Sequence, residues 1–348
     1  MKHAVLTVAV SGSTLRFMDT AKPDTSRNEL FAFSIVRPVR LVLLVCGFIS
    51  PALGQEAERL PVTVFGDGDP YNGVEDSREP LMGDRRMDMG RPSAGAIHCD
   101  GGVRGTAVVV DTSELAPDLE GVVLATAAHV LYDLGKKRRF RRCEFQFLAL
   151  GAIPGYTAEI DLDRSRFGGF DPDKATEEIQ FGKGDWAFLH VPEPWQKFLS
   201  EQSLPVRKFS FARGESFQQS GGRFRLVALD SDSGVISESG DCTVTESGSD
   251  DLGGGAWSGQ LLDDCDSGGG ASGGGIVGVM GDQRYLVGIR TGSHWSGEVF
   301  PAGDYPGGPP AGSLWDPRFN TNFARAVDEG LLRVLAEFVT DLERPPAF

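Results

Sequence analysis

The sequence has few of the residues that metal and nucleic-acid sites require. Its 348 residues include only five histidines and five cysteines, and no two cysteines have the spacing Cys-x-x-Cys. Zinc binding is therefore a weak interpretation, because structural zinc sites commonly use that spacing. The formal net charge of −15 argues against nucleic acid as a partner. A hydrophobic run that could span a membrane is also missing, since the apolar stretch 41–53 is shorter than the roughly 20 residues required.

The stretch 41–53 instead has the features of a secretory signal. It follows Arg37 and Arg40, and small residues stand at the −3 and −1 positions of a signal-peptidase site within 52–54. The sequence therefore predicts an N-terminal extension and signal peptide over 1–54.

Cleavage after this segment would leave a chain that begins at Gln55 and is secreted or periplasmic. We expect no stable membrane anchor. A lipoprotein signal ending at Cys46 is the alternative, but Val45 is bulky for the residue before that cleavage site.

Four cysteines remain beyond the signal: Cys99, Cys143, Cys242 and Cys265. An even number in an exported chain predicts two disulfides. Pairing of neighbours along the chain gives Cys99–Cys143 and Cys242–Cys265. Each is expected to stabilise the fold by about 3–4 kcal/mol, because it restricts the unfolded chain.

Glycine is abundant, at 46 residues, and short strand-like runs recur along most of the chain. Such a pattern is typical of an all-β protein with many tight turns. The runs form two groups, which predict two packed antiparallel β-barrels of the six-stranded type. They are 105–110, 122–126, 145–150 and 186–191, then 224–229, 242–245, 276–280 and 285–290.

The predicted domain is 96–348, with a first barrel at about 96–195 and a second at about 205–325. The polar residues 55–95 before it are expected to be an extended strap or a prosegment packed on the domain.

Apolar residues recur at helical spacing near the C-terminal end, and prolines follow them. This predicts a helix at about 328–343 that closes the second barrel. Two stretches, 151–184 and 299–316, are expected to be long surface loops.

One glycine-rich segment holds a serine in the setting that a nucleophile needs. Gly270 stands two residues before Ser272, and glycine allows a turn in which both backbone N–H groups point inward. These N–H groups of Gly270 and Ser272 are suited to form an oxyanion hole. A flexible Gly/Ser linker is the alternative for the segment taken alone.

A histidine and an aspartate stand at the ends of two strand-like runs. His129 follows 122–126 after two alanines, so its ring can project into a cleft. Asp185 opens the apolar run 186–191, where a carboxylate is costly without a partner, and a histidine Nδ1–H is a suitable one. Taken singly, each is more often an ordinary histidine or a solvated acid.

Together, three segments resemble the triad motifs of the trypsin-like serine peptidases, in that family's His, Asp, Ser order. The resemblance covers about 96–325, and Asp266-Ser267 brings it nearer to the bacterial glutamyl-endopeptidase-like branch than to animal trypsins. It implies a chymotrypsin-like double β-barrel with the triad between the barrels. The matching segments are Thr126-Ala127-Ala128-His129, Asp185-Trp186-Ala187-Phe188-Leu189 and Gly270-Ala271-Ser272-Gly273-Gly274.

Ser267 is the rival nucleophile, because the residues around it also resemble the animal trypsin motif. Ser272 is favoured because it has a glycine two residues before it, where Ser267 has Cys265. Ala271 stands where animal trypsins have an Asp that pairs with a new N-terminus. Activation by such an ion pair is therefore not expected.

The resemblance also suggests a substrate pocket of Asp266, Ser267, Arg290, Thr291 and Ser293. Asp266 holds the position of the trypsin acid that binds Arg or Lys, but glutamyl-specific relatives have an Asp there too. Arg290 stands where those relatives have a histidine for the acidic side chain. It would bind an acidic P1 residue, or pair with Asp266 and leave the pocket neutral.

The sequence thus predicts a secreted serine endopeptidase that acts on protein or peptide substrates without a cofactor. His129 would take the proton of Ser272, Asp185 would orient His129, and an acyl-enzyme would form before water releases it. A catalytically inactive binding protein on the same fold is one alternative. An esterase that uses the same triad is the other.

Overall fold

A computed structural model describes most of the predicted barrel residues. The described residues are 64–66, 76–81, 94–147, 155–174, 183–192, 208–214, 222–231, 233–246, 259–281, 283–296 and 312–344. The predicted signal segment 1–54 and most of the predicted loop 299–316 lie outside them.

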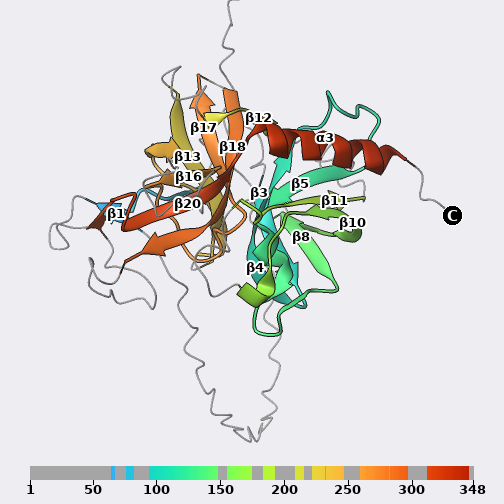
Figure 1. The fold of residues 1–348 in the computed structure, drawn as a ribbon, viewed down its shortest axis with the longest axis horizontal. Helices are drawn as coiled ribbons and strands as arrows, with labels where there is room; N and C mark the ends of the chain where they lie inside the picture. Colours follow the sequence, from blue (N-terminus) through green and yellow to red (C-terminus); the bar gives the residue numbers. More distant parts are fainter. Residues whose placement is uncertain are drawn as a thin grey trace, which may run out of the picture. The chain divides into compact units, whose positions relative to one another are not determined.

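The first sheet has seven antiparallel strands in the order β10-β11-β5-β4-β3-β8-β9 (Figure 1). Their bounds are β3 (Ala94–Cys99), β4 (Gly102–Val110), β5 (Val122–Thr126), β8 (Cys143–Phe147), β9 (Tyr156–Glu159), β10 (Asp161–Phe167) and β11 (Ala187–Val191). β9 and β10 lie at opposite ends of this order, yet only Ile160 separates them in sequence. The sheet must therefore curl until its two edges meet. Counted as one bent strand, β9 and β10 bring this barrel to six strand positions.

The second sheet has nine strands and follows the order β15-β16-β20-β18-β17-β13-β14-β2, with β12 also paired to β18. β14 and β15 again lie near opposite ends, and residues 239–243 connect them. With β2 and β12 set aside as additions from outside it, and β14 and β15 counted as one bent strand, this barrel also has six strand positions. The bounds are β2 (Glu79–Pro80), β12 (Ser210–Phe211), β13 (Arg223–Asp230), β14 (Val235–Glu238), β15 (Val244–Glu246), β16 (Gln260–Asp263), β17 (Gly275–Met280), β18 (Gln283–Trp295) and β20 (Asn320–Ala326).

Short elements complete the described part of the chain. Two strand pairs are β1 (Phe65–Gly66) with β19 (Ser313–Leu314), and β6 (Tyr132–Asp133) with β7 (Arg138–Arg139). The helical elements are the 3-10 turns η2 (Ala128–Leu131) and η3 (Pro172–Lys174) and the helix α3 (Glu329–Glu343).

The predicted all-β architecture of two packed antiparallel barrels with a C-terminal helix is confirmed. One expectation was wrong, since 151–184 contains β9 and β10 rather than only a surface loop. This segment buries only a few apolar side chains, such as Ala158, Ile160 and Leu162, among polar ones. Its sequence therefore lacks the apolar runs by which the other strands were found.

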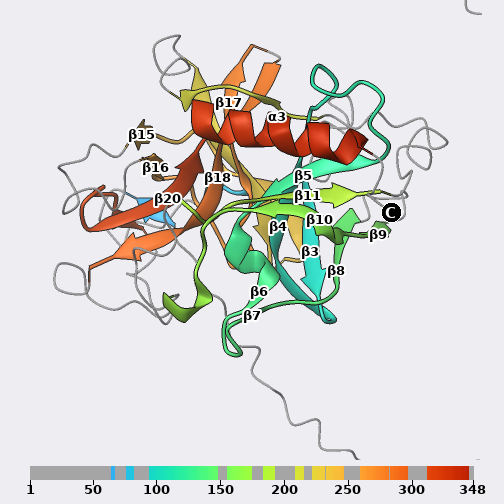
Figure 2. The same ribbon diagram turned by 45° about the vertical axis from the view of Figure 1, so that its right-hand side comes forward.

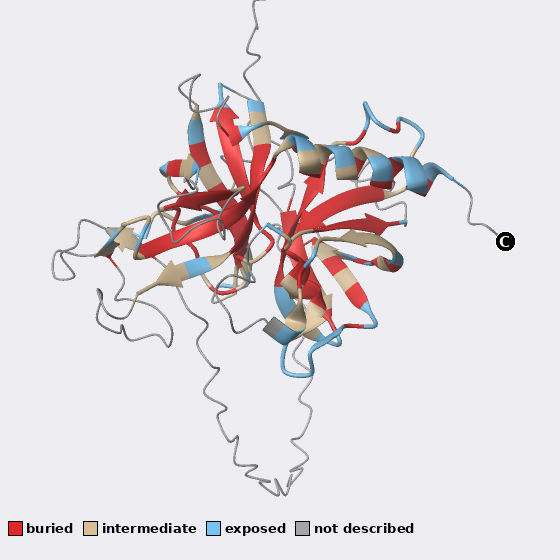
Figure 3. Ribbon diagram, viewed as in Figure 1, coloured by how far each residue is buried: buried red, intermediate tan, exposed pale blue. Residues whose placement is uncertain are grey.

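An apolar layer fills the space between the two barrels and continues under α3. β11 shows why it is needed, because its residues are buried on both faces. Leu189 points into the core of the first barrel, whereas Phe188 belongs to the layer shared with the second. Figure 3 shows the strands buried along most of their length, and α3 with its exposed residues on the outer side. The shared layer includes Val108, Val123, Phe188, Leu229, Val277, Ile289, Leu335 and Phe338.

The helix α3 covers the first barrel, although it follows the second in sequence (Figures 1 and 2). Phe338 stacks on Phe188 of β11 with ring centroids 6.2 Å apart, and Arg164 of β10 donates a hydrogen bond to the carbonyl of Leu342. The expectation that the helix closes the second barrel was therefore wrong. The physical reason is the outer face of β11, whose Phe188 needs an apolar cover.

Within the described residues, no helix is both long and apolar enough to cross a membrane.

Both predicted disulfides are present. Cys99–Cys143 joins the directly paired residues of β3 and β8 in the first barrel. Cys242–Cys265 joins the connection between β14 and β15 to the segment that follows β16. The second disulfide therefore fixes the start of the glycine-rich segment to the wall of its barrel.

Candidate active site

Strand pairing brings His129 and Asp185 together. β5 and β11 are antiparallel, and Ala187 lies opposite Thr126. Asp185, two residues before Ala187, is therefore level with the start of η2, which carries His129. A short strand pair thus aligns two residues that are 56 positions apart in sequence.

Asp185 contacts His129 through both carboxylate oxygens. Its Oδ2 lies 2.7 Å from His129 Nδ1, and its Oδ1 accepts a 2.9 Å hydrogen bond from the His129 backbone N–H. Asp185 is completely buried, whereas the His129 side chain is 12% exposed. The Phe170 ring lies 6.1 Å from the His129 ring, centroid to centroid. Asp185 thus fixes the orientation of the His129 ring through Nδ1, which is what the residue that orients a general base must do.

Thr106 of β4 holds the segment that carries Ser272. Its N–H donates to the Ser272 carbonyl at 2.7 Å, and its hydroxyl donates to the Gly270 carbonyl at 2.7 Å. The same hydroxyl accepts a hydrogen bond from the Leu229 N–H at 2.8 Å. Because β4 and β13 belong to different barrels, the nucleophile segment is tied to both.

Gly273 lies against the turn that leads to His129. A Cβ on Gly273 would lie 2.1 Å from Thr126 Oγ1 and 3.1 Å from the Ala127 nitrogen. Only glycine fits at such a distance. The residue after Ser272 therefore packs directly on the residues that precede His129. Ser272 itself is half-buried, and its hydroxyl makes no hydrogen bond with the described residues.

Gly270 has the backbone conformation expected of an oxyanion-hole glycine. Its φ is +86°, a region that L side chains rarely adopt. Within the described part of the chain, the N–H groups of Gly270 and Ser272 donate no hydrogen bond. Two unpaired N–H groups on a sharp turn beside a serine are the donors that acyl transfer uses.

Ser267, the rival nucleophile, lies elsewhere. It is only 8% exposed, and its hydroxyl lies 3.4 Å from Asn322 Nδ2 of β20. Its partner is thus in β20 of the second barrel, whereas Gly273, next to Ser272, packs on Thr126 and Ala127. The structure associates Ser272, and not Ser267, with the turn that carries His129.

The candidate pocket residues are not equally accessible. Asp266 is 5% exposed and its carboxylate faces the segments 64–66 and 76–81, as described below. Thr291 is buried and its hydroxyl lies 3.4 Å from the carbonyl of Phe323, whereas Ser293 is exposed.

Arg290 pairs with Asp263 and not with Asp266. Its Nη2 lies 2.7 Å from Asp263 Oδ1, and both side chains are buried, at 2% and 0% exposed. Burial raises the pKa of Asp263, while the charge of Arg290 and its hydrogen bond act in the opposite direction. Among the described residues, Nε and Nη1 of Arg290 and Oδ2 of Asp263 have no hydrogen-bond partner. Arg290 therefore has donors left for a ligand, but its charge is matched.

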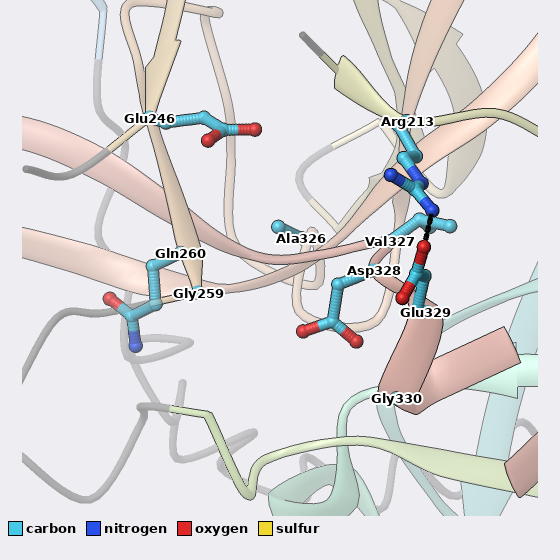
Figure 4. Close-up of a pocket in the computed structure, with 9 residues that line it drawn as sticks. All are labelled: Arg213, Glu246, Gly259, Gln260, Ala326, Val327, Asp328, Glu329 and Gly330. Carbon is cyan, nitrogen blue, oxygen red and sulfur yellow. Dashed lines mark hydrogen bonds and ion pairs between the residues drawn. The ribbon is translucent and has the colours of Figure 1, made fainter. Parts of the chain in front are cut away.

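A cavity of about 370 Å³ lies at the start of α3, apart from these residues. On one side of the cavity, Arg213 forms an ion pair with Glu329. Glu246 and Gln260 lie on the opposite side (Figure 4). None of the predicted site residues lines it. Its lining is Arg213, Glu246, Gly259, Gln260, Ala326, Val327, Asp328, Glu329 and Gly330.

Sequence reasoning missed Thr106 and Asp263. Both are polar residues in apolar surroundings, at 0% exposure, and that mismatch is the only signal in the sequence. Neither lies in a recognisable motif, because the candidate-site residues they contact, Gly270 for Thr106 and Arg290 for Asp263, are more than 25 residues away.

No protein-family model matches the chain, and no curated protein matches its sequence. Solved structures are similar at low identity. A Glu endopeptidase in complex with MPD is 11% identical with a TM-score of 0.46, covering 77% of this chain and 96% of that one. Neuropsin, a serine protease expressed in the limbic system of mouse brain, is 11% identical with a TM-score of 0.43, covering 72% and 95%. At these values the likenesses say nothing about the chemistry, for which the contacts of His129 and Asp185 are the observations.

Proposed function

We propose that this chain is a serine endopeptidase that uses Ser272 as nucleophile, His129 as general base and Asp185 as the residue that orients the base. The observation that carries the proposal is the 2.7 Å contact between His129 Nδ1 and the buried Asp185 Oδ2. This contact orients the His129 ring, and Gly273, the residue after Ser272, packs on the turn that precedes His129.

The reaction follows from these roles. The Ser272 hydroxyl attacks the peptide carbonyl while His129 takes its proton, and Asp185 stabilises the imidazolium that forms. The N–H groups of Gly270 and Ser272 hold the negative oxygen. His129 then protonates the leaving amine, and an acyl-enzyme remains on Ser272. Water, deprotonated by His129, hydrolyses that ester and restores the enzyme.

Labelling with a fluorophosphonate probe tests the nucleophile. The probe reacts with an activated serine, so we expect one adduct, which peptide mass spectrometry locates at Ser272. The change Ser272→Ala should abolish labelling and hydrolysis, whereas Ser267→Ala should leave both measurable. The reverse pattern would move the nucleophile to Ser267.

The same experiment separates the alternatives. A native protein that takes no label would be a binding protein on this fold. A labelled protein that hydrolyses ester substrates but no peptide would be an esterase.

For the residue before the scissile bond, we propose that Arg and Lys are disfavoured. Asp266, the acid that would attract them, already accepts three hydrogen bonds from the protein itself. Arg290, whose charge is matched by Asp263, has unused N–H donors, which suit an acceptor rather than another cation. Cleavage of a peptide library checks this, and a preference for Arg or Lys would contradict it.

We also propose that the protein is secreted or periplasmic. Two disulfides are cross-links that persist in oxidising compartments, which supports export. The other support for export is the sequence of 1–54, which predicts a signal peptide. N-terminal sequencing of the exported protein checks it, with a start at Gln55 expected.

A further inference from the structure

Two segments from before the first barrel, 64–66 and 76–81, form an N-terminal strap on the second barrel. Leu81 N–H donates to the carbonyl of Ile236 at 2.9 Å, and β2 pairs antiparallel with β14. The carbonyl of Val64 accepts a 2.8 Å hydrogen bond from Gly312 N–H. Backbone hydrogen bonds thus fix the strap at both of its described parts.

The strap holds Asp266 with three donors. Asp266 Oδ1 accepts the Phe65 N–H at 2.9 Å, and Oδ2 accepts the Ser77 N–H at 2.9 Å and the Ser77 hydroxyl at 2.5 Å. Ser77 Oγ in turn accepts a 3.1 Å hydrogen bond from Gly240 N–H. Asp266 is buried, so these hydrogen bonds replace the water that a carboxylate would otherwise keep.

Arg78 of the strap packs on the loop 266–272, which begins with Asp266. Its Nε and Nη2 bind Asp76, and its Nη1 lies 3.3 Å from Asp230 Oδ1. A Cβ on Gly268 would lie 2.2 Å from that Nη1, so the guanidinium rests directly on the loop backbone. Burial acts to lower the pKa of Arg78, but Asp76, Asp230 and Asp266 outweigh it, and the pKa is raised.

We propose that Asp266 is a positioning residue, through which the strap holds the loop 266–272 in the shape that catalysis needs. This rests on the proposed function. The loop carries Gly270 and Ser272, the two oxyanion donors, and Ala271 offers no carboxylate to an ion pair that could order it instead. Removal of the strap would leave a buried carboxylate without donors, and the loop would rearrange to hydrate it. The strap is therefore a permanent part of the working enzyme and not a removable prosegment.

The variant Ser77→Ala tests this, because it removes the hydroxyl donor to Asp266, together with the acceptor of the Gly240 N–H, and keeps the Ser77 N–H donor. We expect kcat to fall about tenfold, less than the ~10²–10³ for loss of an oxyanion donor, with KM nearly unchanged. Fluorophosphonate labelling should slow in proportion, and hydrogen exchange across 266–272 should become faster. Ser77→Thr keeps the hydroxyl and should restore kcat. Glu79→Gln, an exposed change in the same strap, is the matched control and should behave as wild type.

Three results would overturn the proposal. One is a Ser77→Ala enzyme with the kcat and exchange rates of wild type. The second is an Asp266→Asn enzyme in which P1 selectivity and KM change while kcat stays, because that identifies a specificity residue. The third is a fully active mature enzyme whose intact mass shows that 64–81 is gone. A wild-type protein that takes no label would instead refute the proposed function itself, whatever the exchange data show for the loop.

Discussion

Thr106 connects the parts of the candidate site at the scale of a single residue. Its hydroxyl bridges Gly270 and Leu229, its N–H binds Ser272, and its carbonyl accepts the Thr126 hydroxyl at 2.6 Å. The loop with the proposed oxyanion donors and the turn with the proposed general base therefore share one anchor. Catalysis of this kind requires positions held to a fraction of an ångström, which such an anchor supplies.

We therefore expect Thr106→Val to reduce activity more than Thr106→Ser. Valine has nearly the same shape but leaves the Leu229 N–H without its acceptor, at a cost of about 1–3 kcal/mol in stability. It also frees the Gly270 carbonyl, so kcat should fall while KM changes little. Steady-state kinetics and urea unfolding of both variants check this. Equal kcat in the two variants would contradict the role of the hydroxyl.

The sequence predicted some of these residues better than others. His129 and Asp185 could be identified from the sequence because each stands at the end of a strand-like run. Strand pairing then aligns them in the structure. Arg290 was expected either to bind an acidic P1 residue or to pair with Asp266, and in the structure it pairs with Asp263. A partner choice of this kind depends on the side-chain packing of three different strands, which no local pattern encodes.

Among the secondary-structure elements, α3 begins at a cap formed by neighbouring residues, although the surface that it covers lies far away in sequence. Asp328 accepts the Leu331 N–H at 2.8 Å and pairs with Arg325 at 2.8 Å, so it caps the first turn of the helix. Burial acts to raise the pKa of Asp328, but the Leu331 N–H and the charge of Arg325 outweigh it, and the pKa is lowered. The ionised form is thus the one that the folded state favours.

This gives a prediction for pH dependence. Asp328→Ala should lower the free energy of unfolding by about 1 kcal/mol at pH 7, because the cap is lost. A lowered folded-state pKa means that the ionic stabilisation is present above the unfolded value of about 4 and disappears as the pH falls through the folded value. The difference between wild type and variant should therefore shrink in acid. Urea unfolding at pH 7 and at a pH below about 4 measures this difference. Asp328→Asn keeps an acceptor, so it should lose less stability than Asp328→Ala.

Elements with strong apolar periodicity were predictable, and others were not. β5 has the bounds expected from 122–126, and α3 agrees with the expected helix at 328–343 within a residue. β9 and β10 were hidden because their sequence is mostly polar and they gain their strand geometry from β8 and β11. The destination of α3 was missed for a similar reason, since only the fold shows that the outer face of β11 lacks a cover.

For the whole molecule, the apolar layer shared by the two barrels and α3 is the decisive feature. Each barrel has its own interior, yet Phe188, Leu229 and Phe338 come from three different parts of the chain and lie in one cluster. Unfolding of either barrel alone would expose this layer to water, at roughly 25 cal/mol for each Å² of apolar surface.

We therefore expect the two barrels to unfold in a single cooperative transition. Differential scanning calorimetry should show one peak, with the calorimetric and van't Hoff enthalpies equal. Phe338→Ala should move this peak to lower temperature without splitting it, because the lost contact belongs to the shared layer. Glu337→Ala, a solvent-facing change one residue earlier in α3, is the control. Two separate peaks in wild type would show that the barrels are independent.

The position of α3 also has a consequence for biosynthesis. The strands it covers precede the whole second barrel in sequence, whereas the helix follows that barrel, so the outer face of β11 stays uncovered until α3 has been synthesised. A chain whose synthesis has not yet reached α3 lacks this cover, and its barrels cannot reach their final packing. The proposed proteolytic activity is therefore expected only after α3 has been synthesised.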